Sequence, residues 1–219
     1  MKKVLLVMCL IFCNIVMSQK INTKNKLIIN HGDMILYLDS DTSTLISKQT
    51  LKWDNFINIG KVERDNNWFD DTYKGKYLEN KFQKTGFDKG HLTPSHITTY
   101  DSLANHKSFS MYNEAPQYSY FNQQPWKNFE QNVEDTIRKY KSDVVIITGV
   151  IYNQKKKTYL PKSRIKIPTH YFKIVIIDKK TWCWIALNSE NKKECVVKET
   201  NLKDLNILFK GNGMKLTIK

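Results

Sequence analysis

The sequence has little glycine, proline or cysteine for its length. Its 219 residues include 8 Gly, 5 Pro and 4 Cys, and they contain no internal repeat and no low-complexity stretch. Collagen-like, solenoid and linker-like chains depend on a high glycine or proline content, on internal repeats or on low-complexity stretches, so these classes are excluded. With 41% hydrophobic and 26% charged residues, the chain is long enough for one well-cored domain and short for two.

Acidic residues are also scarce relative to basic ones. The chain carries 35 Lys and Arg against 21 Asp and Glu, which gives a formal net charge of +14 and a pI near 9.5. Such an excess attracts polyanions, whether nucleic acid, anionic lipid or acidic polysaccharide. Charge alone does not choose among them, and it can equally serve solubility.

Only one long apolar run is present, and it lies at the start of the chain. Residues 4–17 follow Lys2 and Lys3 and precede a polar segment. This layout is typical of a secretory signal peptide. The expectation is therefore a signal peptide over residues 1–18, a single domain over residues 19–219, and a secreted or periplasmic protein.

Two other interpretations of the leader are weaker. A membrane anchor needs about 20 apolar residues, and Asn14 interrupts a shorter run. A lipoprotein cleavage site at residues 10–13 is disfavoured by the bulky Phe12. Two of the four cysteines lie in the leader, and in an oxidising compartment the remaining pair, Cys183 and Cys195, would be expected to form a disulfide.

Periodicity predicts one α+β domain with a substantial sheet. The clearest helix carries an apolar stripe at spacings of three and four, formed by Trp126, Phe129, Val133, Ile137 and Tyr140. A β-branched run at 144–150 predicts a buried strand, and residues 174–177 and 182–187 predict a hairpin. Residues 20–60 suggest strands and loops, residues 65–89 mostly a loop before a short strand, and residues 109–113 another short strand.

One short segment contains several chemically useful side chains in a row. Asp88, Lys89, Gly90 and His91 combine an acid, a phosphate-seeking cation, a flexible backbone position and an imidazole that can accept a proton near neutral pH. Taken alone, such a tetrapeptide is more simply a surface turn with a solvated histidine. Its meaning depends on the residues downstream of it.

The downstream residues complete a longer pattern. The chain continues with Asn-Glu-Ala-Pro-Gln at 113–117 and Asn-Gln-Gln-Pro-Trp-Lys-Asn-Phe-Glu at 122–130. In this order and spacing it resembles the DNA/RNA non-specific endonucleases, with their Asp-Arg-Gly-His, Asn-x-x-Pro-Gln and Asn-x-x-x-Trp-x-x-Leu-Glu motifs. The resemblance spans roughly residues 60–190. It implies a ββα-metal nuclease fold, with a central, mostly antiparallel sheet and the active-site helix packed on it.

The resemblance also implies a role for each matching residue. His91 would be the general base that deprotonates the attacking water, and Asn122 the single direct protein ligand of a divalent ion, magnesium or alternatively manganese. Glu130 would hold water molecules of that ion. Asn113 and Lys89 would orient and bind the phosphate.

The sequence differs from the family motifs at two positions, and a third residue lies outside those motifs. Lys89 replaces the usual arginine, which turns a bidentate phosphate fork into a point charge, and Phe129 replaces a leucine. Arg64 resembles an upstream phosphate-binding arginine of the family, but a solvated surface arginine fits the sequence equally well.

The chemistry is consistent without the family. Phosphodiester hydrolysis needs an activated nucleophile, charge neutralisation and leaving-group stabilisation, which His91, Lys89 and a hydrated Mg²⁺ supply. Amide and carboxylate oxygens suit that hard ion, whereas a zinc site would want Cys and several His. No small-molecule cofactor is implied.

Three hypotheses emerge, in order of preference. The first is an exported, metal-dependent endonuclease acting on DNA, with RNA as a further substrate and little sequence preference, because the candidate residues address phosphate, water or metal. The second is a catalytically silent nucleic-acid-binding protein of the same fold, and the third a basic secreted protein acting on another polyanion. An inhibitor protein is a candidate partner, and the oligomeric state is left open.

Overall fold

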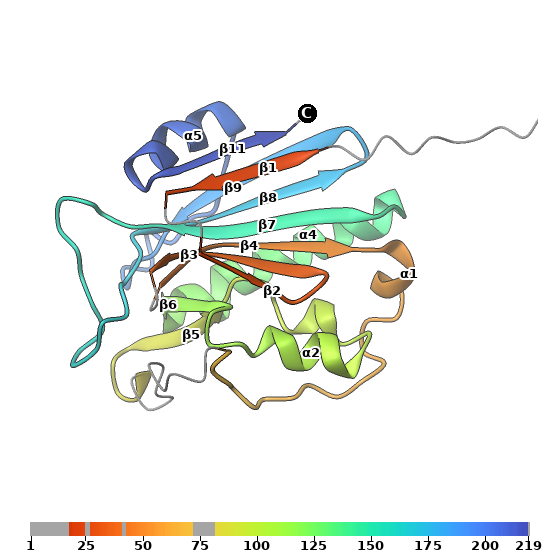
Figure 1. Ribbon diagram of the computed structural model, residues 1–219, viewed down its shortest axis with the longest axis horizontal. Coiled ribbons are helices and arrows are strands. Elements are labelled where there is room, and N and C mark those ends of the chain that lie inside the picture. The colour runs from red at the N-terminus through yellow and green to blue at the C-terminus, as the bar shows by residue number, and fades with distance from the viewer. Residues whose placement is uncertain (1–17, 25–26, 41–42, 72–81, 219) are drawn as a thin grey trace, which may run out of the picture.

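A seven-stranded antiparallel sheet forms the centre of the computed structural model, which describes residues 18–24, 27–40, 43–71 and 82–218 (Figure 1). Its strands, in spatial order, are β10 (Lys198–Thr200), β9 (Lys180–Leu187), β8 (His170–Ile177), β7 (Val144–Ile151), β4 (Ser43–Leu51), β3 (Met34–Ser40) and β2 (Leu27–Asn30). Every neighbouring pair runs antiparallel. The predicted α+β class and the strands expected within residues 20–60 are confirmed.

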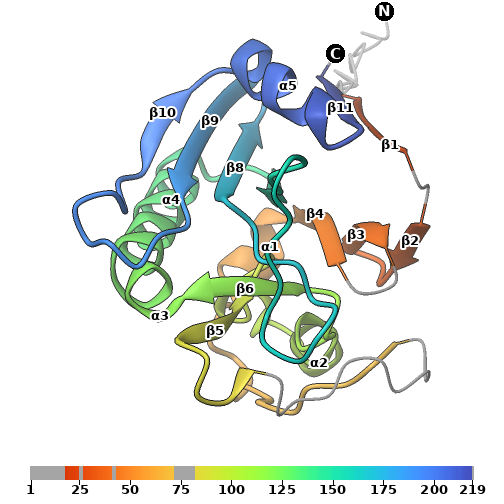
Figure 2. The ribbon, with the colours of Figure 1, turned by 90° about the vertical axis from the view of Figure 1, so that its left-hand side faces the viewer.

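Two small two-stranded sheets lie at opposite ends of the molecule. β1 (Gln19–Thr23) pairs with β11 (Met214–Ile218) beside helix α5 (Leu202–Gly211). β5 (Phe87–His91) pairs with β6 (Glu114–Tyr118), near the short helices η2 (His96–Thr98) and α2 (Ser102–Ser108). Figure 2 shows the β5–β6 ribbon at the end of the molecule away from α5.

The middle of the central sheet is apolar on both faces, as the sequence runs predict. Along β7 and β8, Ile147, Val150, Ile174 and Ile177 are fully buried. The expected hairpin joins β8 to β9, and Asp178 in its turn takes a left-handed φ of 54°. Strands buried on both faces explain why this segment shows no polar alternation.

The active-site helix is longer than its apolar stripe predicts. It begins with α3 (Ser119–Phe121), passes through a π-helical turn, η3 (Asn122–Trp126), and continues as α4 (Lys127–Tyr140). The stripe is buried against the sheet, with the Phe129 ring 5.1 Å from the Trp184 ring. An α-helix would turn Asn122 and Glu130 about 80° apart, whereas one extra residue in a π turn reduces this to about 20°.

Two expectations need correction. Residues 109–113 are turns after α2 instead of a strand, because the Asn113 amide donates to the Ser110 carbonyl, and β6 begins at Glu114. Cys183 and Cys195 are both buried and free, so the expected disulfide is not formed. The Cys195 thiol donates instead to the Ser189 carbonyl at 3.0 Å.

All but the last residue of the expected leader, residues 1–18, lies outside the described residues. Within the part of the chain that the structure describes, no helix is long and apolar enough to cross a membrane. One further helix, α1 (Trp53–Phe56), follows β4.

Candidate active site

The β5–β6 ribbon is the frame of the site. Alternation along β5 puts Lys89 and His91 on one face and Asp88 on the other. Gly90 lies between them, opposite Ala115. A Cβ atom at Gly90 would meet the Gln117 side chain at 2.3 Å, so only glycine lets the two strands approach this closely.

A pocket of about 540 Å³ opens beside His91. Its wall consists of Arg64, Trp68, Phe82, Gln83, Phe87, Asp88, Lys89 and His91. The structure thus brings together Arg64, Lys89 and His91, although Arg64 lies more than 20 residues before the others in the chain. Arg64 is exposed, and its place in the pocket wall favours its interpretation as a site residue.

His91 is a packed strand residue rather than part of a surface-facing loop. Its ring contacts Trp68 and Phe109, with centroid distances of 4.7 and 5.1 Å. Its Nε2 atom is buried and has no hydrogen-bond partner among the described residues. Burial lowers the pKa of His91 to about 3, with Arg64 and Lys89 adding to the effect. The imidazole is therefore neutral at physiological pH.

The two cations of the pocket rest on aromatic rings. The Lys89 ammonium lies 4.5 Å from the Trp68 ring centroid, and the Arg64 guanidinium lies 5.1 Å from that of Phe109. Such contacts hold cations in place while their charge still faces a ligand. Sequence reasoning missed Trp68 and Phe109, because an isolated aromatic in a loop or turn carries no periodic signal.

Asp88 anchors the active-site helix at the edge of this pocket. Its carboxylate accepts hydrogen bonds from Ser119 Oγ at 2.7 Å, Asn122 Nδ2 at 2.8 Å and Gln123 Nε2 at 2.9 Å. Because the Asn122 nitrogen is directed to Asp88, its amide oxygen points the other way and is available as a ligand. A hard ion such as Mg²⁺ prefers an oxygen of this kind, so the residues present fit the expected ion.

Within the described ranges, no three His, Cys, Asp or Glu side chains are grouped so that they could hold a metal ion.

Asn113 is fully buried and its amide is occupied by the backbone. Its Nδ2 donates to the carbonyls of Thr93 and Ser108, and its Oδ1 accepts from the Thr93 amide, all within 2.9 Å. These bonds fasten the segment after His91 to the end of α2. The geometry favours a bracing role over the expected direct contact with phosphate.

Glu130 makes a partly buried ion pair that no sequence pattern predicts. The Lys173 ammonium lies 2.9 Å from Glu130 Oε1 and 5.4 Å from the centroid of the Trp126 ring. The Lys173 side chain is 2% exposed and that of Glu130 is 20% exposed. Lys173 lies within the apolar strand β8, so its chain position suggested only core.

Glu114 is a buried acid directly opposite His91 in the ribbon register. Neither carboxyl oxygen has a hydrogen-bond partner in the described part of the chain. Burial raises the pKa of Glu114 well above its usual value, while Lys89 opposes the shift. When its carboxyl is protonated, Glu114 does not neutralise the positive charge of the pocket.

This pKa predicts how stability depends on pH. Because the folded-state pKa is raised, the native state binds a proton that the unfolded chain releases above about pH 4.3, so wild-type stability falls as pH rises. Glu114→Gln removes this loss, which can reach about 1.4 kcal/mol per pH unit for one group. In urea unfolding, the free energy of unfolding of the variant minus that of wild type should be larger at pH 8 than at pH 5. The same difference at both pH values would contradict this prediction.

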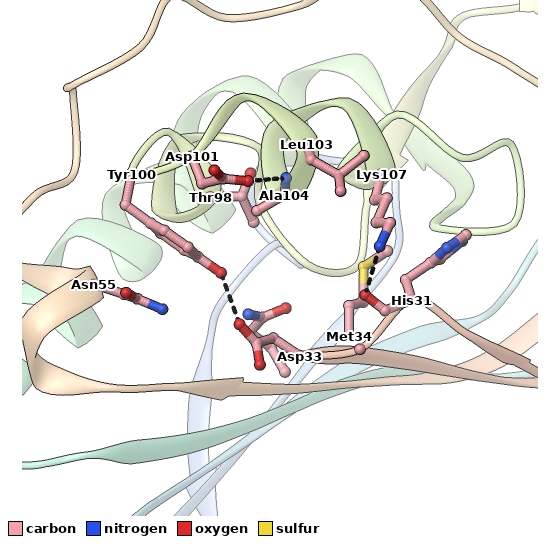
Figure 3. Close-up of a pocket in the computed structure, with 12 residues that line it drawn as sticks. His31, Asp33, Met34, Asn55, Thr98, Tyr100, Asp101, Leu103, Ala104 and Lys107 are labelled. Carbon is pink, nitrogen blue, oxygen red and sulfur yellow. Dashed lines mark hydrogen bonds between the residues drawn. The ribbon is translucent and has the colours of Figure 1, made fainter.

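A second pocket, of about 450 Å³, lies between β3 and α2 (Figure 3). There the Tyr100 hydroxyl donates to the Asp33 carboxylate at 3.2 Å, and Asp101 caps helix α2. None of the residues expected to act in the site lines it.

Comparison with known proteins places this geometry in a family. A family model described as DNA/RNA non-specific endonuclease matches residues 14–211. The chain belongs to that family. A crystal structure of an EndoG/EndoGI complex matches with a TM-score of 0.69 at 18% identity, over 83% of this chain and 82% of that one. The expected ββα-metal nuclease fold of this family is thereby confirmed.

Two mitochondrial nucleases match part of this chain. Mitochondrial endonuclease G of Homo sapiens is 29% identical over 44% of this chain and 35% of its own length. The mitochondrial nuclease of Saccharomyces cerevisiae is also 29% identical, over 50% of this chain and 36% of its own length. The chain therefore matches about a third of the length of these relatives.

These names overturn the expected localisation. The human and yeast family members are mitochondrial proteins, so the prediction of a secreted or periplasmic protein is wrong.

Proposed function

We propose that this chain is a divalent-metal-dependent endonuclease that hydrolyses phosphodiester bonds of DNA, and of RNA as a further substrate, with little sequence preference. The observation that carries the proposal is the pocket in which Arg64 and Lys89 flank the neutral imidazole of His91, whose Nε2 atom is buried. Two cations bind a phosphate, and a neutral imidazole beside it accepts a proton from water.

Arg64 and Lys89 also affect the basicity of His91. Part of the lowered pKa of His91 comes from Arg64 and Lys89, after burial. A bound phosphate neutralises both charges, so the basicity of His91 should rise when the substrate arrives. His91 would therefore be a better proton acceptor when a phosphodiester is bound in the pocket.

Asn122 and its neighbours would hold the ion. Mg²⁺, with Mn²⁺ as an alternative, would neutralise charge on the phosphoryl oxygens and stabilise the leaving oxygen. Asp88 fixes the orientation of the Asn122 amide. Glu130 lies further along the same helix, and its carboxylate accepts a hydrogen bond from Lys173 of β8. Lys89 and Arg64 bind the phosphate from the pocket side, while Asn113 braces the segment after His91.

A cleavage assay tests the proposal directly. Supercoiled plasmid should be nicked and then degraded with Mg²⁺ or Mn²⁺, and EDTA should stop the reaction. The alternative, a catalytically silent nucleic-acid-binding protein, predicts retarded but intact plasmid under all conditions. Sequenced product ends should be scattered, because the site residues address phosphate, water or metal instead of base edges.

Asn122→Ala should lower activity by about 10- to 100-fold or more, since ligand and support residues of metal sites carry effects of this size. Added Mg²⁺ should restore it only in part. The matched control is Gln123→Ala, because Gln123 donates to the same Asp88 oxygen from the next position. Equal metal titration curves for wild type and Asn122→Ala would place the ion elsewhere.

An inhibitor protein is the candidate partner. The matching crystal structure is described as an EndoG/EndoGI complex that explains EndoG inhibition. A protein that covers the pocket around His91 would block this site.

A further inference from the structure

The connection between β7 and β8 is a strongly basic loop. Residues 153–167, which we name the basic loop, contain no Asp or Glu and six cations: Lys155, Lys156, Lys157, Lys162, Arg164 and Lys166. Lys166 pairs with Asp39. The side chains of Lys155, Lys156 and Lys157 are exposed.

This loop is held in a defined position. Leu160 and Ile165 are 1% and 3% exposed and belong to the smaller of the two apolar clusters of the protein. The Leu160 amide donates to the Ile165 carbonyl at 3.0 Å, and the Ile167 amide to the Thr158 carbonyl at 2.8 Å. Its lysines are therefore presented on a fixed support, at a lower entropic cost than on a free chain.

The support is shared with the active pocket. The cluster that buries Leu160 and Ile165 also contains Phe82, and Trp68 and Phe87 pack against it. Those three aromatic residues line the pocket of His91. In Figure 1 and Figure 2 the loop lies beside β6, at the end of the molecule that carries the ribbon.

We propose that the basic loop binds backbone phosphates of a nucleic-acid strand next to the phosphate held by Lys89 and Arg64, without reading bases. This rests on the proposed function. Duplex DNA carries one charge per about 1.7 Å of axis, so a strand in the pocket must place further phosphates within reach of neighbouring cations. Lysine is a point charge on a flexible stem, which suits contact with any sequence.

The test compares two triple variants with equal loss of charge. The first is Lys155→Gln/Lys156→Gln/Lys157→Gln. The control is Lys203→Gln/Lys210→Gln/Lys215→Gln, in exposed positions of α5 and β11 at the far end of the molecule. Affinity for a fluorescent 30-base-pair duplex is measured in EDTA across a salt series, and hydrolysis of bis(4-nitrophenyl) phosphate and of DNA is measured with Mg²⁺.

The loop variant should bind DNA with a salt slope shallower by about one for each phosphate that the loop no longer neutralises. Its KM for DNA should rise several-fold, with kcat and hydrolysis of the small diester unchanged. The control should behave as wild type. Equal slopes for both triple variants would overturn the proposal. So would loss of binding to anionic phospholipid vesicles with an unchanged DNA slope, which would assign the loop to lipid.

The two proposals fail separately. If wild type hydrolyses neither substrate, the proposed function fails, while the EDTA binding series still tests the loop. If wild type cuts DNA and the loop variant does so with unchanged KM and slope, only the loop proposal fails.

Discussion

His91→Gln should lower the rate of phosphodiester hydrolysis by about 10²- to 10⁴-fold, the usual contribution of general acid–base catalysis. The reason is that His91 Nε2 lies in the pocket without a partner among the described residues, and the lowered pKa of His91 keeps the ring unprotonated. Glutamine retains much of the side-chain volume between Trp68 and Phe109, so folding should survive. Affinity for DNA in EDTA should change little.

His96→Gln provides the matched control. His96 is five residues further on, its side chain is 62% exposed, and it lies 3.6 Å from Glu134 outside the pocket. This variant should keep wild-type activity. Near-wild-type cleavage by His91→Gln, with thermal unfolding showing a folded protein, would remove His91 from the role of base.

Glu130→Ala should destabilise the protein by about 3–5 kcal/mol, as expected when removal of one partner leaves a buried charge unpaired. The charge left behind would be that of Lys173, whose side chain is 2% exposed and would then rest against the Trp126 ring. A metal titration of this variant would therefore mix lost stability with lost metal affinity. Urea unfolding measures the first separately.

Two further variants separate these effects. Glu130→Gln keeps an oxygen for Lys173 and should lose less stability than Glu130→Ala while still weakening the metal response. The double variant Glu130→Leu/Lys173→Met replaces both charges with apolar groups and should be more stable than Glu130→Ala. If Glu130→Ala unfolds at the wild-type urea concentration, the ion pair contributes no net stability and the argument is wrong.

Local patterns predicted much of the fold. The β-branched run became β7, the expected hairpin became β8 and β9, and the apolar stripe became the buried face of α4. These predictions are confirmed because hydrophobic periodicity indicates which side of a helix or strand is buried. The strand expected at 109–113 failed because backbone hydrogen bonds close turns there that composition does not reveal.

The sequence by itself determined the family and the order of the candidate site residues, since Asp-Lys-Gly-His and the downstream asparagines and glutamate are local motifs with fixed spacing. Only the tertiary structure decided that Arg64 joins Lys89 and His91, that Asp88 directs the Asn122 amide, and that Lys173 pairs with Glu130. Each of these depends on where β5, β8 and the active-site helix meet. Such contacts join positions far apart in the chain, and they are fixed by the burial of whole elements, which no local pattern encodes.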